Sequence, residues 1–299
     1  MRLAAVDIGS NTVHALVADV VNGKLEDVGH YVEMPELGVQ VARTGVIGSR
    51  AKPALRSLQV VVDQARNHGF DHLVAGATQA VRQASDGPAF VRQASVVVGV
   101  PVRIISARRE AVLSFRGVAS RHAAKREWAM LDLGGASTEV VIANGHEMLR
   151  SAILPIGSGV LADKYLSDPP RADERARLRK AAMRELAHAP DADVERLVAT
   201  GGTASNLPLV LNRHNPPTVL TTADLLACEA RLDGDKAAKV GHSSGLPVNR
   251  IKAMRGGVEA LLLFLDWFGL AVLQISHEGL RHGMLLAYLE QGEDWWKAG

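Results

Sequence analysis

The sequence feature that most constrains the fold is a short motif that occurs twice. The first copy is Asp7-Ile8-Gly9-Ser10-Asn11-Thr12, and the second is Asp132-Leu133-Gly134-Gly135-Ala136-Ser137. Apolar runs on both sides of each copy predict two strands joined by a tight turn. Each copy then runs into an Asn-Gly hairpin signal, at Asn22-Gly23 and at Asn144-Gly145. One such turn is compatible with a plain hairpin, whereas two copies heading two halves of one chain indicate duplicated domains.

The residues of these turns suit the binding of phosphate. Glycine allows positive φ and a close backbone approach, so each turn can present N–H groups to an anion. Ser137 and Thr138 add hydroxyl donors, but Asp132 and Glu139 at the two ends of the second turn would repel a bare phosphate. A hard divalent cation such as Mg²⁺ could bind the two carboxylates and the phosphate together, which would remove this repulsion. We therefore expect one phosphate loop in each domain, the two facing each other across a cleft.

The order of predicted elements is typical of an α/β protein. The first half predicts strands 3–6, 13–20 and 24–31, a loop 34–48, a helix capped by Ser49, a strand 73–77, a helix opened by Asp86, a buried strand 102–105 and a helix from about Ser106. The second half predicts a hairpin 128–153, a helix opened by Gly157, a charged amphipathic helix 171–188 with one solvated face, a strand 197–199, a third glycine turn 200–205 that enters a helix, and loops at 215–217 and 242–247.

Composition excludes several other classes of protein. With 299 residues, 47% hydrophobic and 22% charged, the chain is expected to form one or two soluble globular domains. A net charge of +2 without an all-basic patch argues against nucleic-acid binding. Cys228 is the only cysteine, so neither a disulfide framework nor a zinc cluster is expected. The most apolar run, 258–275, contains charged residues, which argues against a membrane span. Without a signal peptide ahead of the first strand, we expect a cytoplasmic protein.

Two charged residues that follow predicted strands leave alternatives open. Glu110 lies early in a helix after the buried strand 102–105, where a carboxylate often only complements the helix dipole. Arg82 follows the strand 73–77 and is equally compatible with a surface salt bridge. An Arg near a phosphate loop is, however, well shaped for bidentate phosphate contact.

Several motifs together resemble the exopolyphosphatase/guanosine pentaphosphate phosphatase (Ppx/GppA) family. They are 7–12, 77–82, 132–139, 151–157, 200–203 and 245–283, in the same order and over nearly the whole chain. The chain is similar to the short, two-domain form of this family, which belongs to the actin/hexokinase-like superfamily. The resemblance implies two actin-like domains, each with a mixed five-stranded sheet. We expect residues 1–116 with 281–299 in the first domain and 117–280 in the second.

The resemblance also implies roles for individual residues. Glu110 matches the family's catalytic base, in the segment Ser106-Ala107-Arg108-Arg109-Glu110-Ala111, and would deprotonate the water that attacks the terminal phosphorus. The remaining residues match positions that bind metal (Asp7, Asp132, Glu139) or phosphate (Gly9, Ser10, Asn11, Arg82, Gly134, Gly135, Ser137). The implied activity is Mg²⁺-dependent release of terminal phosphate from inorganic polyphosphate or guanosine pentaphosphate. A homodimer is left open.

The sequence also departs from the family's pattern. Ala107 and Ala136 replace glycines, and His282 replaces a common Glu. Val160 stands where an Arg is usual, and the Pro35-Glu36 loop lacks a basic residue. The loss of two cations weakens the case for long polyanions, so we predict that short polyphosphates are preferred. Two other functions remain open: a catalytically weak sensor of polyphosphate or (p)ppGpp, and a kinase of the same superfamily.

Overall fold

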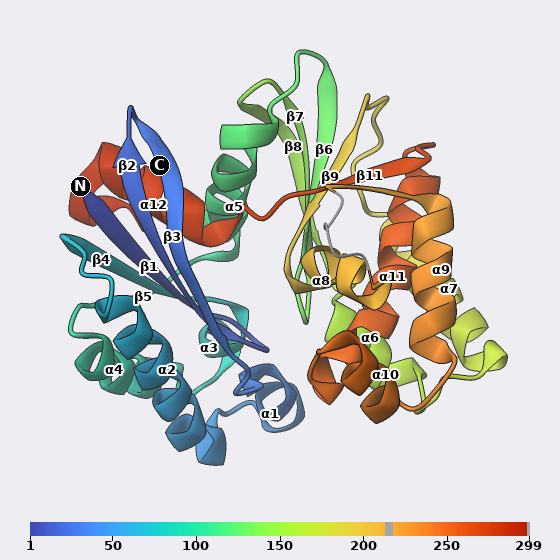
Figure 1. The fold of residues 1–299 in the computed structure, drawn as a ribbon, viewed down its shortest axis with the longest axis horizontal. Helices are drawn as coiled ribbons and strands as arrows, with labels where there is room; N and C mark the ends of the chain where they lie inside the picture. The colour runs from blue at the N-terminus through green and yellow to red at the C-terminus, as the bar shows by residue number, and fades with distance from the viewer. Residues whose placement is uncertain (213–217, 298–299) are drawn as a thin grey trace. The chain divides into compact units, whose positions relative to one another are not determined.

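The computed structural model describes residues 1–212 and 218–297. The chain divides into two compact units, which Figure 1 shows as separate sheets with their own helices. Unit 1 is Met1–Gly117 with Glu278–Gly299, and unit 2 is Val118–His277. The predicted domain boundaries stay a prediction. The loop expected at 215–217 lies outside the described residues.

Unit 1 is built on a mixed sheet of five described strands in the order β3-β2-β1-β4-β5. The strands are β1 (Arg2–Ile8), β2 (Val13–Val21), β3 (Lys24–Glu33), β4 (His72–Ala77) and β5 (Val102–Ile104). The first three form an antiparallel meander, and β4 and β5 continue parallel to β1. Turn Asn22-Gly23 joins β2 to β3 with both residues at positive φ, as a type I′ hairpin requires.

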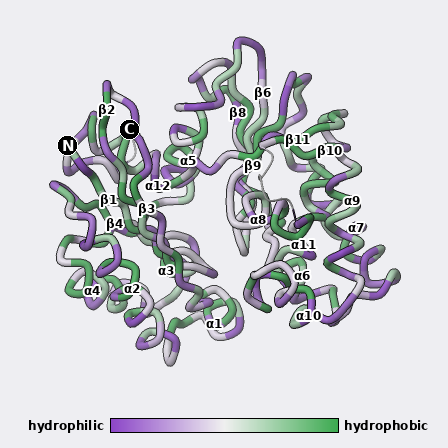
Figure 2. Tube along the Cα trace, viewed as in Figure 1, coloured by the Kyte–Doolittle hydropathy of each residue, from purple (hydrophilic) through white to green (hydrophobic). Residues whose placement is uncertain are grey.

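Helices cover both faces of this sheet. They are α1 (Leu37–Thr44), α2 (Ala51–Arg66), α3 (Gln79–Gln83), α4 (Gly87–Val98), α5 (Ala107–His122, of which residues 107–117 belong to this unit) and α12 (Leu280–Gln291), with 3₁₀ turns η1 (Gly48–Arg50) and η2 (Gly292–Asp294). Successive residues of β1 point to opposite faces, so Val6 packs against α2 and α4 while Leu3 packs against α12. Figure 2 shows these central strands as mostly hydrophobic.

Unit 2 repeats this sheet and adds a strand. Its described strands are β6 (Glu127–Leu133), β7 (Thr138–Asn144), β8 (Glu147–Leu154), β9 (Leu197–Thr200), β10 (Val219–Thr221) and β11 (Val272–Ile275). The order β8-β7-β6-β9-β11 matches that of unit 1, and β10 pairs antiparallel with β11 at the edge. The prediction of five strands in this half was therefore wrong. Strand β10 gives little sequence signal because it is three residues long and buries only Leu220.

Six helices complete the described part of unit 2. They are α6 (Ser158–Tyr165), α7 (Ala172–Leu186), α8 (Gly202–Val210), α9 (Thr222–Asp233), α10 (Ala237–Ser244) and α11 (Val248–Trp267). Helix α11 is apolar and buried around most of its circumference, which makes it the centre of this unit's core. None of the helices in the described ranges is long and apolar enough to cross a membrane.

Four local predictions were wrong for identifiable reasons. The expected loop 34–48 contains α1, whose Leu37 and Val41 are buried one turn apart, and α10 extends into the loop expected at 242–247. Ser49 does not cap α2 but lies in the 3₁₀ turn that precedes it. The second hairpin turns at Gly145-His146 instead of Asn144-Gly145, because Asn144 still pairs with Glu147.

Candidate active site

The turn between β1 and β2 in unit 1 is closed by its own backbone. Ile8 pairs with Val13, and the Gly9 N–H donates to the Thr12 carbonyl over 2.9 Å. A Cβ added at Gly9 would lie 3.2 Å from that carbonyl oxygen. Because the Gly9 N–H closes the turn, contact with an anion falls to the residues between Gly9 and Thr12.

The turn between β6 and β7 in unit 2 has the same construction. Leu133 pairs with Thr138, and the Gly134 N–H donates to the Ser137 carbonyl over 3.0 Å. Asp132 lies directly opposite Glu139 in the strand pair, and the Ser137 hydroxyl donates to Glu139 Oε1 over 3.0 Å. The repeated motif in the sequence is therefore a repeated backbone structure.

The two turns differ in one chemical group. In unit 1 the residue opposite Asp7 is His14, and its Nε2 lies 2.8 Å from the Thr12 hydroxyl. His14 thus occupies the position that Glu139 has in unit 2. A pair of carboxylates suits a hard cation, whereas a carboxylate facing an imidazole does so less well, so the second turn is the better candidate for metal binding.

Each turn accepts a hydrogen bond from the start of the next helix, which follows β3 in unit 1 and β8 in unit 2. In unit 1 the Ser10 carbonyl accepts from Gly38 N–H over 2.7 Å, at the start of α1. In unit 2 the Gly134 carbonyl accepts from Ser158 N–H over 2.9 Å, at the start of α6. A Cβ at Gly157 would come within 2.2 Å of the Ala136 backbone, so only glycine allows this approach.

Glu110 and Arg82, which the sequence treats separately, form an ion pair in unit 1. Arg82 Nη1 donates to Glu110 Oε2 over 2.9 Å and to the Ile105 carbonyl over 2.6 Å. The side chains are 15% exposed for Glu110 and 25% exposed for Arg82, so both still reach solvent. Glu110 lies in the first turn of α5, and its N–H bonds to the Ser106 carbonyl. The salt-bridge alternative for Arg82 is thus realised, with the predicted base as its partner.

The third glycine turn lies beside Asp132. Strand β9 runs parallel to β6 with Thr200 opposite Asp132, and Gly201 follows at φ +97°. A Cβ at Gly201 would lie 2.6 Å from the Leu133 carbonyl oxygen and 3.5 Å from Asp132 Oδ1. Glycine is required here by both the backbone conformation and the neighbouring strand.

Comparison with known proteins identifies the family. The model of the Ppx/GppA phosphatase family matches residues 16–291 of this chain. The chain belongs to the Ppx/GppA phosphatase family. It is an enzyme of this family, as the motifs predicted.

Individual relatives share modest identity but nearly full length. A curated Haemophilus influenzae protein whose name carries the term exopolyphosphatase is 24% identical over 295 residues, which cover 95% of this chain and 90% of that protein. The Aquifex aeolicus PPX-GPPA enzyme is 26% identical with a TM-score of 0.80, covering 96% and 99% of the two chains. An exopolyphosphatase structure from Cytophaga hutchinsonii, 23% identical with a TM-score of 0.87 over 97% and 98%, shows the same fold. The predicted fold class, two actin-like α/β domains, is confirmed.

Arg250 lies at the candidate site of this Ppx/GppA protein, although the sequence did not predict it as a site residue. Its guanidinium lies against the third glycine turn, where a Cβ at Gly202 would come within 2.2 Å of Nη1. Arg250 is half-buried, and burial lowers its pKa from the usual value. No carboxylate among residues 1–212 and 218–297 forms an ion pair with it. Nothing in the local sequence distinguishes Arg250 from the many other arginines, because its position depends on the packing of α11.

The predicted metal ligands supply some of the oxygen donors that a hard cation needs. Asp132 and Glu139 provide two carboxylates at adjacent positions of one strand pair in unit 2, and Asp7 belongs to unit 1. Among the described residues no group of three or more Asp, Glu, His or Cys side chains could hold a metal ion by itself. Mg²⁺ commonly binds one or two carboxylates and completes its shell with water and substrate phosphate. The donor set therefore fits Mg²⁺, and metal binding stays a prediction.

Val160 marks a position where a cation is missing from the second turn. Its N–H donates to the Gly135 carbonyl over 3.0 Å, which places Val160 at the turn itself, and its side chain is 39% exposed. An Arg at this position would extend a guanidinium from the second turn. Valine leaves that surface uncharged.

Proposed function

We propose that this chain releases the terminal phosphate of inorganic polyphosphate or of guanosine pentaphosphate. Membership of the Ppx/GppA family supports a phosphatase, and the curated relative from Haemophilus influenzae carries the term exopolyphosphatase in its name. The observation that carries the proposal is the Glu110–Arg82 ion pair at the start of α5, which is mostly buried but still reaches solvent. It combines a carboxylate that can accept a proton from water with a cation suited to phosphate oxygens.

In this proposal Glu110 is the general base. The ion pair with Arg82 and the start of α5 fix the direction of the carboxylate. A positioned carboxylate orients the attacking water and takes its proton as the new O–P bond forms. The bond from phosphorus to the bridging oxygen breaks in the same displacement, and the shortened polyphosphate or nucleotide leaves with the electron pair. Arg82 then neutralises part of the charge on the phosphoryl group and keeps the carboxylate in place.

Phosphate is proposed to bind at the two turns. The residues are Gly9, Ser10 and Asn11 in unit 1 and Gly134, Gly135 and Ser137 in unit 2. Gly9 and Gly134 act by closing their turns, and the N–H groups that follow them contact the anion. Arg250 adds a cation beside the third turn, which compensates in part for the missing Arg at Val160.

Mg²⁺ is proposed to bind at Asp132 and Glu139, with Asp7 as a further ligand. When bound, it would neutralise phosphate charge that these carboxylates otherwise repel. Removal of divalent cations with a chelator should abolish phosphate release, and Mg²⁺ should restore it. Full activity in excess chelator would contradict this part of the proposal.

The central test is Glu110→Gln. Loss of a general base typically lowers the rate ~10²–10⁴-fold, and glutamine keeps the size and one hydrogen-bond acceptor. We expect that loss in kcat for phosphate release from short-chain polyphosphate. Glu26→Gln, on the exposed part of β3 in the same unit, is the matched control and should keep wild-type activity. Equal rates for Glu110→Gln and wild type would refute the role of Glu110.

A sensor of polyphosphate or (p)ppGpp is the second candidate function. It is favoured by one observation, the uncharged Val160 at the second turn. A sensor would show thermal stabilisation by these ligands without phosphate release. A kinase would instead transfer phosphate from ATP to an acceptor. Incubation with γ-labelled ATP and candidate acceptors would show whether the label appears on an acceptor or as free phosphate.

A further inference from the structure

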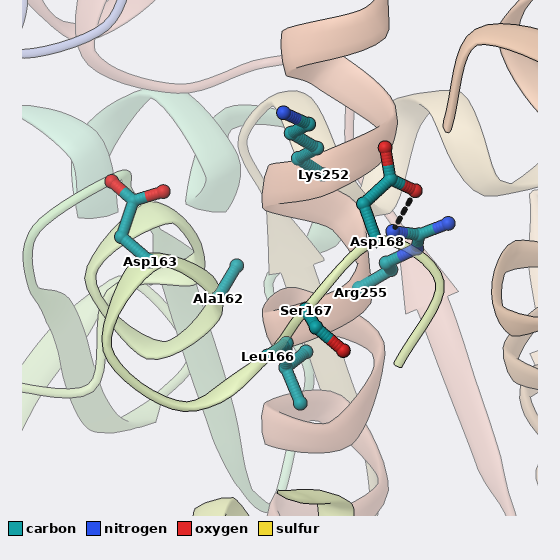
Figure 3. Close-up of a pocket in the computed structure, with 7 residues that line it drawn as sticks. All are labelled: Ala162, Asp163, Leu166, Ser167, Asp168, Lys252 and Arg255. Atoms are coloured by element: carbon teal, nitrogen blue, oxygen red, sulfur yellow. Dashed lines mark hydrogen bonds and ion pairs between the residues drawn. The ribbon is translucent and has the colours of Figure 1, made fainter. Parts of the chain in front are cut away.

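A pocket in unit 2 lies between α6, the segment 166–168 and the first turns of α11. Its volume is about 190 Å³. Figure 3 shows the side chains that line it: Ala162, Asp163, Leu166, Ser167, Asp168, Lys252 and Arg255. The pocket is large enough for one planar ring system but not for a whole nucleotide.

One wall of the pocket is a fixed ion pair. Arg255 is only 1% exposed, and Nη1 donates to Asp168 Oδ1 over 2.9 Å. Its other donors bind the carbonyls of Leu232 and Asp235. Asp168 Oδ1 also accepts from the Ala237 N–H over 2.7 Å. These contacts satisfy Arg255 within the protein, so it shapes the pocket without being available to a ligand.

Asp163 and Lys252, unlike Asp168 and Arg255, are not bonded to each other. Figure 3 shows them on the two helices that border the pocket, Asp163 on α6 and Lys252 on α11. Within the described part of the chain, neither side chain makes a hydrogen bond, nor an ion pair within 4 Å. Burial raises the pKa of Asp163, and the charge of Lys252 opposes that shift. The pocket is therefore bordered by a carboxylate and an ammonium group that do not form an ion pair with each other.

The helices that carry these two groups are in direct backbone contact. A Cβ at Gly256 of α11 would lie 2.4 Å from the Ser158 carbonyl oxygen and 2.9 Å from the Ala162 N of α6. Glycine therefore allows α6 and α11 to pack without intervening side chains. This packing fixes the separation between the backbones at Asp163 and Lys252.

The two groups suit a ligand with an acceptor and donors side by side on one planar edge. Guanine has this pattern, since its O6 acceptor adjoins the N1–H and N2–H donors. Lys252 can donate to O6, and the Asp163 carboxylate can accept from N1–H and N2–H. Adenine presents an amino donor beside an acceptor nitrogen, which reverses the pattern. Ala162 and Leu166 provide apolar surface for the ring.

The pocket is also at a suitable distance from the second phosphate turn. Helix α6 begins at Ser158, whose N–H bonds to the Gly134 carbonyl, and Asp163 follows five residues later. Five residues correspond to a rise of about 7.5 Å along a helix. A sugar can bridge this span between a base in the pocket and a phosphate at the turn.

We propose that this pocket binds the guanine base of a guanosine polyphosphate, with Asp163 and Lys252 recognising the edge of the base. The inference rests on the proposed function, because it assumes that phosphate binds at Gly134–Ser137. It adds a nucleobase site to a chain for which inorganic polyphosphate alone would need none.

The test compares nucleoside diphosphates in wild type and in Asp163→Asn. Wild type should bind guanosine diphosphate roughly tenfold more tightly than adenosine diphosphate, measured by calorimetry with Mg²⁺. Asparagine can donate to the O2 of xanthine, so Asp163→Asn should instead favour xanthosine diphosphate over guanosine diphosphate. A gain of xanthosine binding cannot come from misfolding. Lys164→Met, beside the pocket on α6, is the matched control and should keep the wild-type preference.

The outcomes separate this inference from the proposed function. Equal affinity of wild type for the guanosine and adenosine diphosphates, or an unchanged preference in Asp163→Asn, would overturn the guanine site. Phosphate release from inorganic tripolyphosphate should be the same in wild type, Asp163→Asn and Lys252→Met, because that substrate has no base. Absence of release from every substrate in wild type would overturn the proposed function, whatever the base preference.

Discussion

Glu229 on α9 is a carboxyl group whose protonation is coupled to folding. Its pKa is raised from 4.5 to about 7, chiefly by burial and also by the charge and hydrogen bond of the neighbouring Glu259 carboxyl on α11. Asp233 on α9 acts in the same direction, whereas Arg175 on α7, 3.3 Å away, lowers it. The folded protein therefore holds this proton more tightly than the unfolded chain does.

The sign of the pH dependence follows from this shift. The stabilising contribution is complete below pH 4.5, declines as pH rises, and is lost above about pH 7. Glu229→Gln mimics the protonated form, so it should raise the Tm relative to wild type at pH 8 and leave it unchanged near pH 4.5. At about 1.4 kcal/mol per pKa unit, the rise from 4.5 to about 7 limits the gain at pH 8 to about 3–4 kcal/mol. Thermal denaturation between pH 4.5 and 8 measures this, and a lower Tm of the variant at pH 8 would contradict it.

Arg250 offers a second prediction at the residue scale. If its guanidinium binds substrate phosphate beside Gly202, then Arg250→Met should raise KM about tenfold or more, because one charge-assisted hydrogen bond contributes roughly 1.5–3 kcal/mol. Arg250→Lys should recover part of this loss, since the charge remains but the forked geometry does not. Steady-state kinetics with short polyphosphate would show both effects. A purely structural role would lower the Tm of Arg250→Met and leave KM as it is.

At the scale of elements, the contact between α5 and α12 is the most sensitive to side-chain size. A Cβ at Gly283 of α12 would lie 1.8 Å from the Leu113 carbonyl oxygen of α5, and one at Gly117 would lie 2.1 Å from the Gly279 oxygen. The two helices therefore pack backbone to backbone. Glu110 lies one turn before Leu113, so this contact also supports the candidate site.

Gly283→Ala should force α5 and α12 apart. Overpacking of this kind typically costs about 1–3 kcal/mol, and a backbone contact leaves little room for relief. Gly69→Ala is the matched control: its Cβ has open space, and only the strain at φ +63° remains, about 1–2 kcal/mol. Urea denaturation should show the larger loss of stability for Gly283→Ala. A smaller loss than for the control would mean that the helices can adjust.

The sequence predicted the elements that have local signals and missed those that depend on packing. Strands β1 and β6 were predicted from apolar runs ahead of glycine turns, and α4 from Gly87-Pro88 near its start. Helix α1 was missed because the segment 34–48 contains three glycines and a proline, which outweigh one pair of buried residues, Leu37 and Val41. In the candidate site, Glu110 and Arg82 were recognised by their motifs. Their ion pair was not, since it joins residues 28 apart in the sequence.

At the scale of the whole molecule, the duplicated sheet explains why the chain carries two similar turns with different chemistry. Both units share one strand order and one turn structure, which fixes where a phosphate-binding loop can occur. Different side chains on this shared backbone then give each turn its own chemistry. His14 faces Asp7 in unit 1, and Glu139 faces Asp132 in unit 2. The chemistry is therefore set by a few side chains on a backbone that the repeat conserves.

The charge of the whole molecule limits the substrates it can hold. An enzyme that processes long polyphosphate needs a track of cations, because every phosphate of the bound chain carries a charge to be matched. This chain has a formal net charge of only +2 at pH 7. Val160 and the Pro35-Glu36 segment are uncharged or acidic near the two turns, and Arg109 is buried, with its guanidinium bonded to the Trp295 carbonyl and Gln291. Arg109 is thus unavailable as a substitute cation.

We therefore predict higher kcat/KM for short polyphosphates than for chains of hundreds of phosphates. The measurement is a panel of polyphosphates of graded length, together with guanosine pentaphosphate, assayed with Mg²⁺ for released phosphate at several salt concentrations. Binding that neutralises many phosphates weakens steeply with salt through counterion release, whereas contact with two or three phosphates gives a shallow dependence. Val160→Arg should steepen the salt dependence and improve activity on longer chains by adding one cation at the second turn. If the longest chains gave the highest kcat/KM with strong salt sensitivity in the wild type, a basic track would have to exist and this prediction would be wrong.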